Sequence, residues 1–133
     1  MKNNFHTFAT VSKYRIMLSI NKDKQHLIER LKQEHALWSY RQDAINDVPD
    51  DILIELVMIH LDLDDIELLF TMYPYQRVKK AWIENVVAQG DLYYVLNKFF
   101  AWYYFHAKKP GPYVKAMATR QLNKRIAAHR LKR

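Results

Sequence analysis

The acidic run Asp62-Leu63-Asp64-Asp65 is the part of the chain that comes nearest to a catalytic motif. Two carboxylates separated by one residue can project together from a strand and hold Mg²⁺, as in nucleotidyltransferase folds. That chemistry also needs a turn of small residues upstream to hold a phosphate, and the sequence has no glycine before Gly90. We therefore favour the interpretation that these acids end one helix and cap the next. A small metal-dependent nucleotidyltransferase-like enzyme using Asp62 and Asp64 stays the alternative, which a strand over residues 60–66 would support.

The histidines, serines and cysteines do not form a recognisable site. No two of the six histidines stand four residues apart, so no helical metal site is present, and His60 is expected to be structural rather than a catalytic base. None of the three serines, Ser12, Ser19 and Ser39, has the neighbouring glycines of a nucleophile elbow. The absence of cysteine excludes thiolate nucleophiles and cysteine-bound zinc. We expect no catalytic residue, no metal and no cofactor.

A group of basic residues that begins at Arg77, shortly after Pro74, favours contact with nucleic acid. The segment from Asp64 to Val87 predicts two helices joined by a short break, a helix-turn-helix layout whose second helix enters the major groove of DNA. Any two packed helices with surface lysines give the same pattern, so a solvated helix face is the alternative. The residues expected to meet the nucleic acid in this segment are Gln76, Arg77, Lys79 and Lys80.

The net charge of +7 is distributed very unevenly along the chain. Residues 1–42 carry a net charge of +5, residues 43–75 contain nine acids and no Lys or Arg, and residues 76–133 contain thirteen Lys or Arg against two acids. Neutralisation of phosphates supplies much of the affinity for nucleic acid, so the basic C-terminal region predicts such a contact. The alternatives are a solvated helix face and a basic arm that pairs with the acidic segment. The phosphate contacts predicted in this region are Arg120, Lys124 and Arg125.

The composition predicts an all-α fold, a compact bundle of about five to six helices in one domain. Two glycines and four prolines supply too few turns for a many-stranded sandwich. Weak periodicity over residues 1–22 predicts a loosely ordered segment, followed by a single helical domain over residues 23–133 with a basic C-terminal helix. The expected helices are about 23–35, from a cap within 47–51 to about 62, from a cap at 62 or 64 to 73, and about 75–88, 92–107 and 113–131.

Three of these helices carry patterns that predict how they pack. In helix 92–107 aromatic residues occur nearly all round, which indicates core packing, whereas an exposed Tyr or Trp face would mark a homodimer or partner surface, or a platform for single-stranded bases. The residues expected to face inward are Val78, Ala81, Trp82 and Val86 in helix 75–88, and Val114, Ala118, Leu122 and Ile126 in helix 113–131.

No segment is expected to cross a membrane or to target the chain to one. The most apolar run, residues 92–105, is short and contains Asn97 and Lys98, which is unsuitable for a bilayer span. Residues 1–20 lack the uninterrupted apolar core of a signal peptide. The absence of cysteine fits a reducing compartment, so we expect a cytoplasmic protein.

Several short runs resemble a family of short uncharacterised bacterial proteins over about residues 37–120. Members of that family are often encoded beside nucleotidyltransferase-type toxins of the abortive-infection class, so the resemblance implies an antitoxin-like role with DNA and a toxin-like protein as partners. It implies no catalytic residue. The matching runs are Leu37-Trp38-Ser39-Tyr40, Val48 to Glu55, Leu61 to Ile66, Leu69-Phe70, Tyr73-Pro74, Val78-Lys79, Trp82, Tyr94 to Asn97 and Pro110 to Tyr113.

The sequence therefore predicts a non-enzymatic, antitoxin-like regulatory protein that binds DNA through helix 75–88 and the basic C-terminal helix. The alternative is a helical protein-interaction module. It would use the aromatic helix, or the acidic stretch from Asp47 to Asp65, to hold a basic partner.

Overall fold

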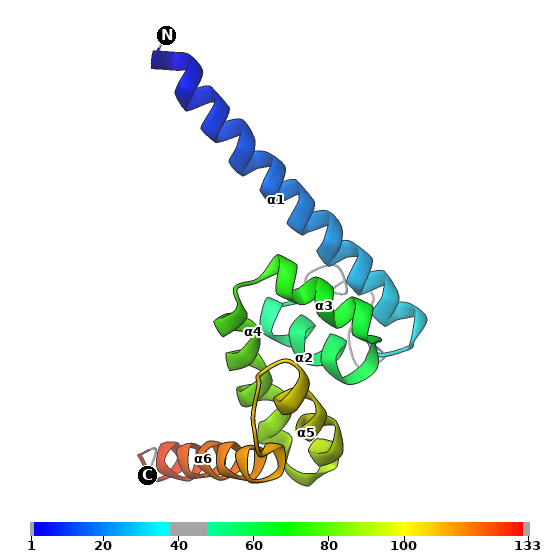
Figure 1. Cartoon of the computed structure of the whole chain (residues 1–133), viewed down its shortest axis with the longest axis vertical. Helices are drawn as coiled ribbons and strands as arrows, with labels where there is room; N and C mark the ends of the chain where they lie inside the picture. Colours follow the sequence, from blue (N-terminus) through cyan, green and yellow to red (C-terminus); the bar gives the residue numbers. More distant parts are fainter. Residues whose placement is uncertain (1, 38–47, 132–133) are drawn as a thin grey trace.

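A computed structural model describes residues 2–37 and 48–131, with side chains from Ser12 onward, and all regular structure in these ranges is helical (Figure 1). The predicted all-α fold is confirmed. In chain order the elements are α1 (Lys2–Gln33), α2 (Asp50–His60), α3 (Leu63–Met72), α4 (Tyr75–Ala81), η2 (Trp82–Val86), η3 (Val87–Tyr93), α5 (Tyr94–Tyr103) and α6 (Pro110–Leu131). Two of them are irregular turns, the π-helix η2 and the 3-10 helix η3, which continue directly from α4.

Helix α1 begins at Lys2, whereas the sequence predicted a loosely ordered segment up to residue 22 and a helix only from residue 23. Only the last part of α1 packs on the domain, where Leu27, Ile28 and Leu31 are fully buried. The part before it projects from the domain (Figure 1), and every residue from 12 to 19 is exposed. The projecting part of α1 buries no face, so its sequence needs no apolar periodicity. For this reason the periodicity of residues 1–22 did not predict a helix.

Helices α2 and α3 lie where the sequence places them. Helix α2 follows Pro49 and buries Leu53, Ile54 and Val57, and α3 ends before Pro74, as expected for a residue that disfavours helical geometry in its predecessor. The predicted capping role of the acids is wrong for Asp62. It occupies the N-cap position of α3 but makes no capping hydrogen bond with its side chain.

The acidic side chains of this region bind α1 instead. The Asp50 carboxylate accepts hydrogen bonds from the Tyr73 hydroxyl at 2.6 Å and from Lys24 Nζ at 3.1 Å, which links α1, the start of α2 and the end of α3. Arg30 lies 3.4 Å from Asp65 and 3.5 Å from Asp62. Burial alone would raise the pKa of Asp50, but these hydrogen bonds and the charges of Lys24 and Arg77 outweigh it and lower the pKa below its ordinary 3.8.

Helix α4 continues into the π-turn η2, where the sequence predicted a regular helix over residues 75–88. Trp82 opens this turn and is fully buried, stacked on Phe105 with ring centroids 4.5 Å apart. Its indole Nε1 donates a 2.9 Å hydrogen bond to Oδ1 of Asn97 on α5, which is also fully buried. The chain then breaks at Gly90, whose φ of 79° suits glycine best, in the gap between the predicted helices 75–88 and 92–107.

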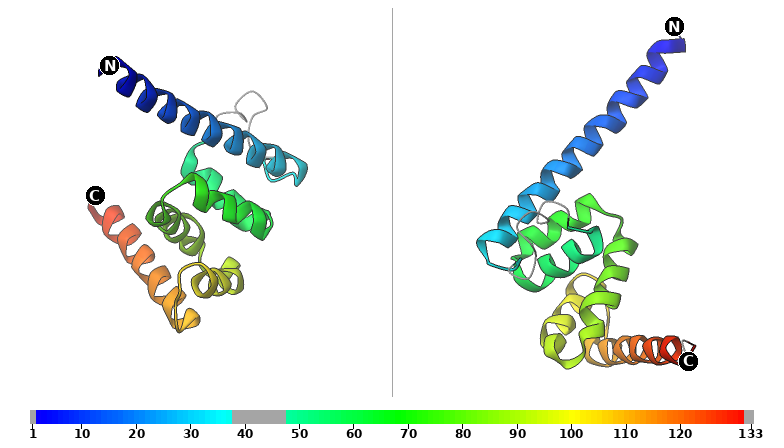
Figure 2. Two further views of the ribbon diagram at one scale, coloured as in Figure 1. Left: turned by 45° about the horizontal axis from the view of Figure 1, so that its top comes forward. Right: turned by 180° about the vertical axis from the view of Figure 1, so that it is seen from behind.

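Helix α5 is shorter than predicted, and α6 starts at Pro110, three residues earlier than predicted. The predicted inward stripe of α6 is only partly inward. Val114 is buried, but Leu122 and Ile126 are 56% and 43% exposed, because the second half of α6 projects from the domain (Figure 2). In residues 2–37 and 48–131, no helix is long and apolar enough to cross a membrane.

The Asp50 contact predicts a specific acid sensitivity. A carboxyl with a lowered folded-state pKa stabilises the fold above its unfolded pKa, and this contribution is lost as the pH falls through the folded pKa. Replacing Asp50 with Asn should lower the free energy of unfolding at neutral pH by about 1 kcal/mol, since the group is partly exposed. The difference from the wild type should shrink as the pH falls below the ordinary value of 3.8, and it should disappear once the pH has passed through the lowered folded-state pKa. Urea unfolding at several pH values measures this, with Asp91→Asn, at an exposed position away from these contacts, as the control of equal charge change. Equal pH profiles for D50N and D91N would refute the assignment.

The buried pair of Trp82 and Asn97 predicts a non-additive stability pattern. Trp82→Phe leaves the Asn97 amide without its partner and also creates a void, so it should destabilise the protein by about 3 kcal/mol. Adding Asn97→Leu to that variant should restore part of the loss, because both polar groups are then removed together. Urea unfolding of the single and double variants gives the coupling energy. A strictly additive double variant would show that the hydrogen bond contributes nothing.

Candidate nucleic-acid interface

Four of the seven predicted nucleic-acid contacts line one groove between the α4 side of the domain and α6. This groove has a volume of about 310 Å³. It exists because α6 packs against η3 and against η2, the direct continuation of α4. Side chains of α6 therefore reach the basic side chains of α4. The side chains that line it are Gln76, Lys79 and Lys80 from α4, Ile83 and Glu84 from η2, and Gln121 and Lys124 from α6.

Helical spacing explains how these side chains share the groove. Gln76, Lys79, Lys80 and Ile83 recur at intervals of three and four residues, so they lie on one side of the continuous helix from α4 into η2. The predicted inward residues of this helix, among them Val78, are buried on another side. The helix therefore separates an apolar side that holds it to the core from a basic side that faces the groove.

The groove is electropositive. It contains the ammonium groups of Lys79, Lys80 and Lys124 and a single carboxylate, that of Glu84. None of the three lysines forms an ion pair with another described residue. Lys79 is half-buried, and its Nζ lies 5.8 Å from the centre of the Tyr113 ring, a contact that positions the charge without neutralising it. Such an arrangement can bind an anion.

Arg77 lies outside the groove, although the sequence placed it with the other basic residues. Its Nη2 is 3.3 Å from the Asp51 carboxylate, and its guanidinium lies 5.9 Å from the Tyr73 ring. The side chains of Arg77, Asp51, Lys80, Ala81 and Glu84 surround a smaller hollow of about 160 Å³. The charge of Arg77 is thus partly compensated within the protein.

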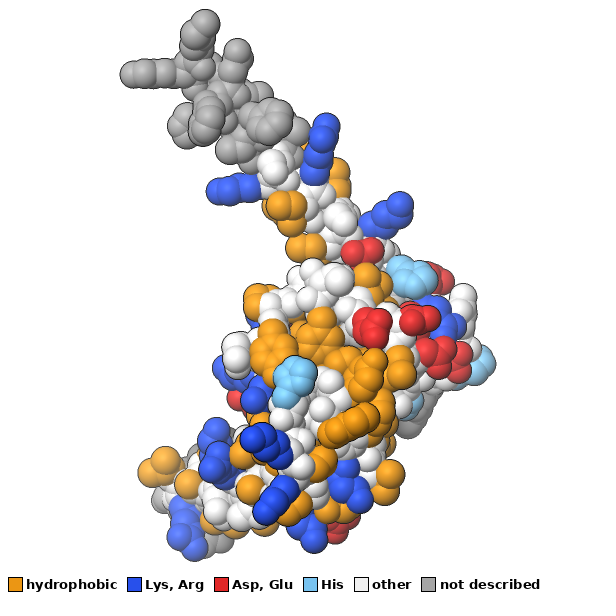
Figure 3. All heavy atoms as spheres, viewed as in Figure 1, with side chains coloured by type: hydrophobic (Ala, Val, Ile, Leu, Met, Phe, Trp, Pro, Cys, Tyr) orange, Lys and Arg blue, Asp and Glu red, His pale blue; other side chains and the backbone are white. Residues whose placement is uncertain are grey.

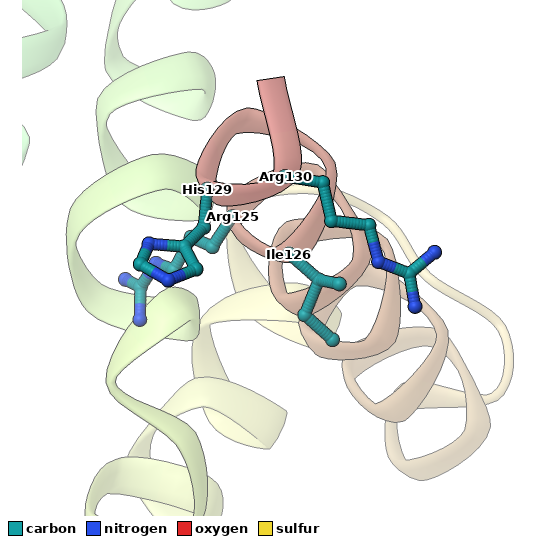
Figure 4. A pocket seen from close by; sticks show the side chains of 4 residues that line it. All are labelled: Arg125, Ile126, His129 and Arg130. Atoms are coloured by element: carbon teal, nitrogen blue, oxygen red, sulfur yellow. The ribbon is translucent and has the colours of Figure 1, made fainter. Parts of the chain in front are cut away.

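Arg120 and Arg125 also lie outside the groove, on α6. Arg120 is exposed. Arg125 borders a surface hollow of about 340 Å³ together with Ile126, His129 and Arg130 (Figure 4). All four side chains come from α6, with Arg125 and His129 extending to one side of Ile126 and Arg130 to the other. All the described residues that line this hollow thus belong to one exposed helix.

The enzyme alternative on Asp62 and Asp64 required a strand, and the structure shows a junction between two helices. Asp62 precedes α3, and Asp64 stands in its first turn. No group of three or more metal-ligating side chains that could hold a metal ion occurs in residues 12–37 and 48–131. The strand on which the enzyme alternative depended is therefore absent from residues 60–66, and the favoured junction between two helices is present.

Sequence reasoning missed Ile83, Glu84 and Gln121 as lining residues. Gln121 stands one turn before Lys124 and shares its face of α6, so helical spacing could have identified it. No local signal indicates that this face lies opposite Lys79 and Lys80, about forty residues earlier in the chain.

The two-helix layout predicted from residue 64 onward is present as α3, a Tyr73-Pro74 junction and α4. Because α6 packs against η2, and its Gln121 and Lys124 reach the basic side of α4, that side forms one wall of a groove rather than a freely projecting recognition helix. Comparison with protein-family models, curated proteins and solved structures found no match to this chain. The resemblance to the family of short bacterial proteins, and the use of this layout on DNA, remain predictions.

Proposed function

We propose that this is a non-enzymatic, antitoxin-like regulatory protein of the bacterial cytoplasm that binds DNA along the groove between α4 and α6. The observation that carries the proposal is the convergence of Lys79, Lys80 and Lys124 from two separate helices on one surface. Three ammonium groups against one carboxylate suit a phosphate backbone, which is recognised mainly through its charge.

The surroundings of the groove support the same proposal. Helix α6 contains five Lys or Arg and no acid, so Arg120, Arg125 and Arg130 continue the positive surface beyond the groove. Gln76 and Gln121 add amide groups at the groove itself, and amides can pair with base edges as well as with phosphates. The lysines therefore supply affinity, and the glutamines are the candidates for any preference in sequence.

The test removes the three groove charges together. The variant K79A/K80A/K124A should bind duplex DNA much more weakly, and the slope of log K against log salt should decrease by about 2.7, at about 0.9 per lost phosphate contact. Fluorescence anisotropy with a labelled duplex, between about 50 and 200 mM salt, measures both effects.

The matched control is K22A/K108A/K109A, which removes the same charge from exposed sites outside the groove. It should keep most of the wild-type affinity and slope. If both triple variants lose equal affinity for DNA, the net charge of the protein and not the groove explains the binding. If the wild type does not bind DNA at low salt, the proposal is refuted.

A second candidate function, as a protein-interaction module for a toxin-like partner, is favoured by one observation. Trp102 and Tyr103 on the aromatic helix α5 are 59% and 44% exposed, and exposed aromatic side chains are characteristic of binding surfaces. Co-expression with the product of a neighbouring gene, followed by purification of either protein, tests this candidate. Loss of co-purification in Trp102→Ala, but not in K79A/K80A/K124A, would assign the partner to α5.

A further inference from the structure

The projecting part of α1, residues 2–20, which we call the arm, has no other described element packed along residues 12–19, all of which are exposed. At 1.5 Å per residue, α1 is about 48 Å long, and only its C-terminal part reaches the core. Four large apolar side chains of the arm, Tyr14, Ile16, Met17 and Leu18, are each at least half exposed. Isolated helices are marginal in water, and most helical stability in proteins comes from packing. The arm therefore lacks the contact that would keep it helical.

A second unpartnered surface lies on α3 and the end of α5, and we call it the docking face. It combines exposed Leu63, Trp102 and Tyr103 with the exposed acids Asp64 and Glu67. Figure 3 shows acidic side chains beside a broad hydrophobic area over these two helices.

Aromatic contacts make this surface continuous between the two helices. Phe70 of α3 stacks on Tyr104 at 5.0 Å between ring centroids, and Tyr104 meets Tyr103 edge-on at 4.9 Å. Burial, with smaller contributions from the charges of Glu67 and Asp64, raises the pKa of Tyr104 to about 12, in keeping with acids that border the aromatic cluster.

The arm and the docking face are complementary in charge. Residues 2–20 contain Lys2, Lys13 and Arg15 and no acid. Asp64 and Glu67 form no ion pair with the described residues, in contrast to Asp50, Asp62 and Asp65, which bind α1. The arm thus offers apolar groups with basic charge, and the docking face offers apolar groups with acidic charge.

We propose that the arm of one chain packs on the docking face of a second copy, and that the exchange is reciprocal. Figure 1 shows α1 leaving the domain away from its own α5, so a continuous helix cannot fold back onto the docking face of the same chain. Reciprocal exchange gives a closed two-fold dimer.

Two arms pairing with each other would bring like charges together. Helix α6, the other basic helix, exposes fewer large apolar side chains than the arm, with only Leu122, Ile126 and Leu131 over its whole length. The inference uses no residue of the proposed DNA groove and stands independently of that function.

The first test is the mass of the full-length protein in solution. Light scattering on a size-exclusion column should show a dimer, and helicity measured by circular dichroism should fall on dilution as the arm loses its partner. Trp102→Ala should raise the dissociation constant of the dimer about 30-fold or more, as expected for a central tryptophan. Because Trp102 is mainly exposed, the thermal midpoint of the diluted monomer should stay unchanged.

The decisive test is a charge exchange. Each of the variants K13E/R15E and D64K/E67K should weaken the dimer about tenfold or more, since the arm and the docking face then lose their opposite charges. The chain that carries all four substitutions should dimerise nearly as well as the wild type. The matched control R120E/R125E reverses two charges on α6 and should leave the dimer intact.

Because the chain has no cysteine, single cysteines permit a direct check. A mixture of Met17→Cys and Thr71→Cys chains should be joined by a short bismaleimide, whereas Met17→Cys mixed with Asn123→Cys should not. The proposal is overturned by a monomer at every accessible concentration. Three further results would overturn it equally. The first is a dimer that D64K/E67K does not weaken, and the second is a chain with all four substitutions that fails to dimerise. The third is a dimer that only R120E/R125E dissociates.

Discussion

The contact between the acidic centre of the chain and the buried part of α1 is the interaction on which the rest of the structure depends. Lys24 and Tyr73 meet on the Asp50 carboxylate, and Arg30 reaches both Asp62 and Asp65, so one set of ion pairs joins α1, α2 and α3. The acids are thereby partly neutralised by the N-terminal region rather than by the C-terminal one. The basic side chains of α4 and α6, apart from Arg77, consequently keep their charge for an external anion.

The π-turn η2 has a comparable effect on the second half of the molecule. A π-turn widens a helix locally and changes the direction of the chain after it. Here it places Trp82 between the stack on Phe105 and the hydrogen bond to Asn97, which holds α5 against the α4 side of the domain. With Gly90 breaking this stretch, the chain turns back, and α6 packs against α5, η3 and η2. The groove that brings Lys79 and Lys124 together is a consequence of this turn.

The DNA groove and the docking face are separate surfaces, so DNA binding and the proposed dimer are compatible. Protein–DNA contacts depend on uncompensated basic groups, which α4 and α6 supply, whereas association of two chains depends on apolar surface with complementary charge, which the arm and the docking face supply. A two-fold dimer would present two copies of the groove related by the same axis. Dimeric DNA-binding proteins use this arrangement to bind two half-sites with matching symmetry.

The sequence by itself determined the all-α class, the ends of α2 and α3, the break at Gly90 and the inward residues of α4, including Trp82. These depend on local signals, namely apolar spacing and the backbone restrictions of Pro and Gly. Only the tertiary structure decided that residues 2–22 are helical, that Asp62 binds Arg30 instead of capping α3, and that Lys124 shares a groove with Lys79. Each of these depends on which helices lie side by side, or on a helix that buries no face. Contacts between residues distant in sequence, and the lack of contacts, leave no periodic mark in a single sequence.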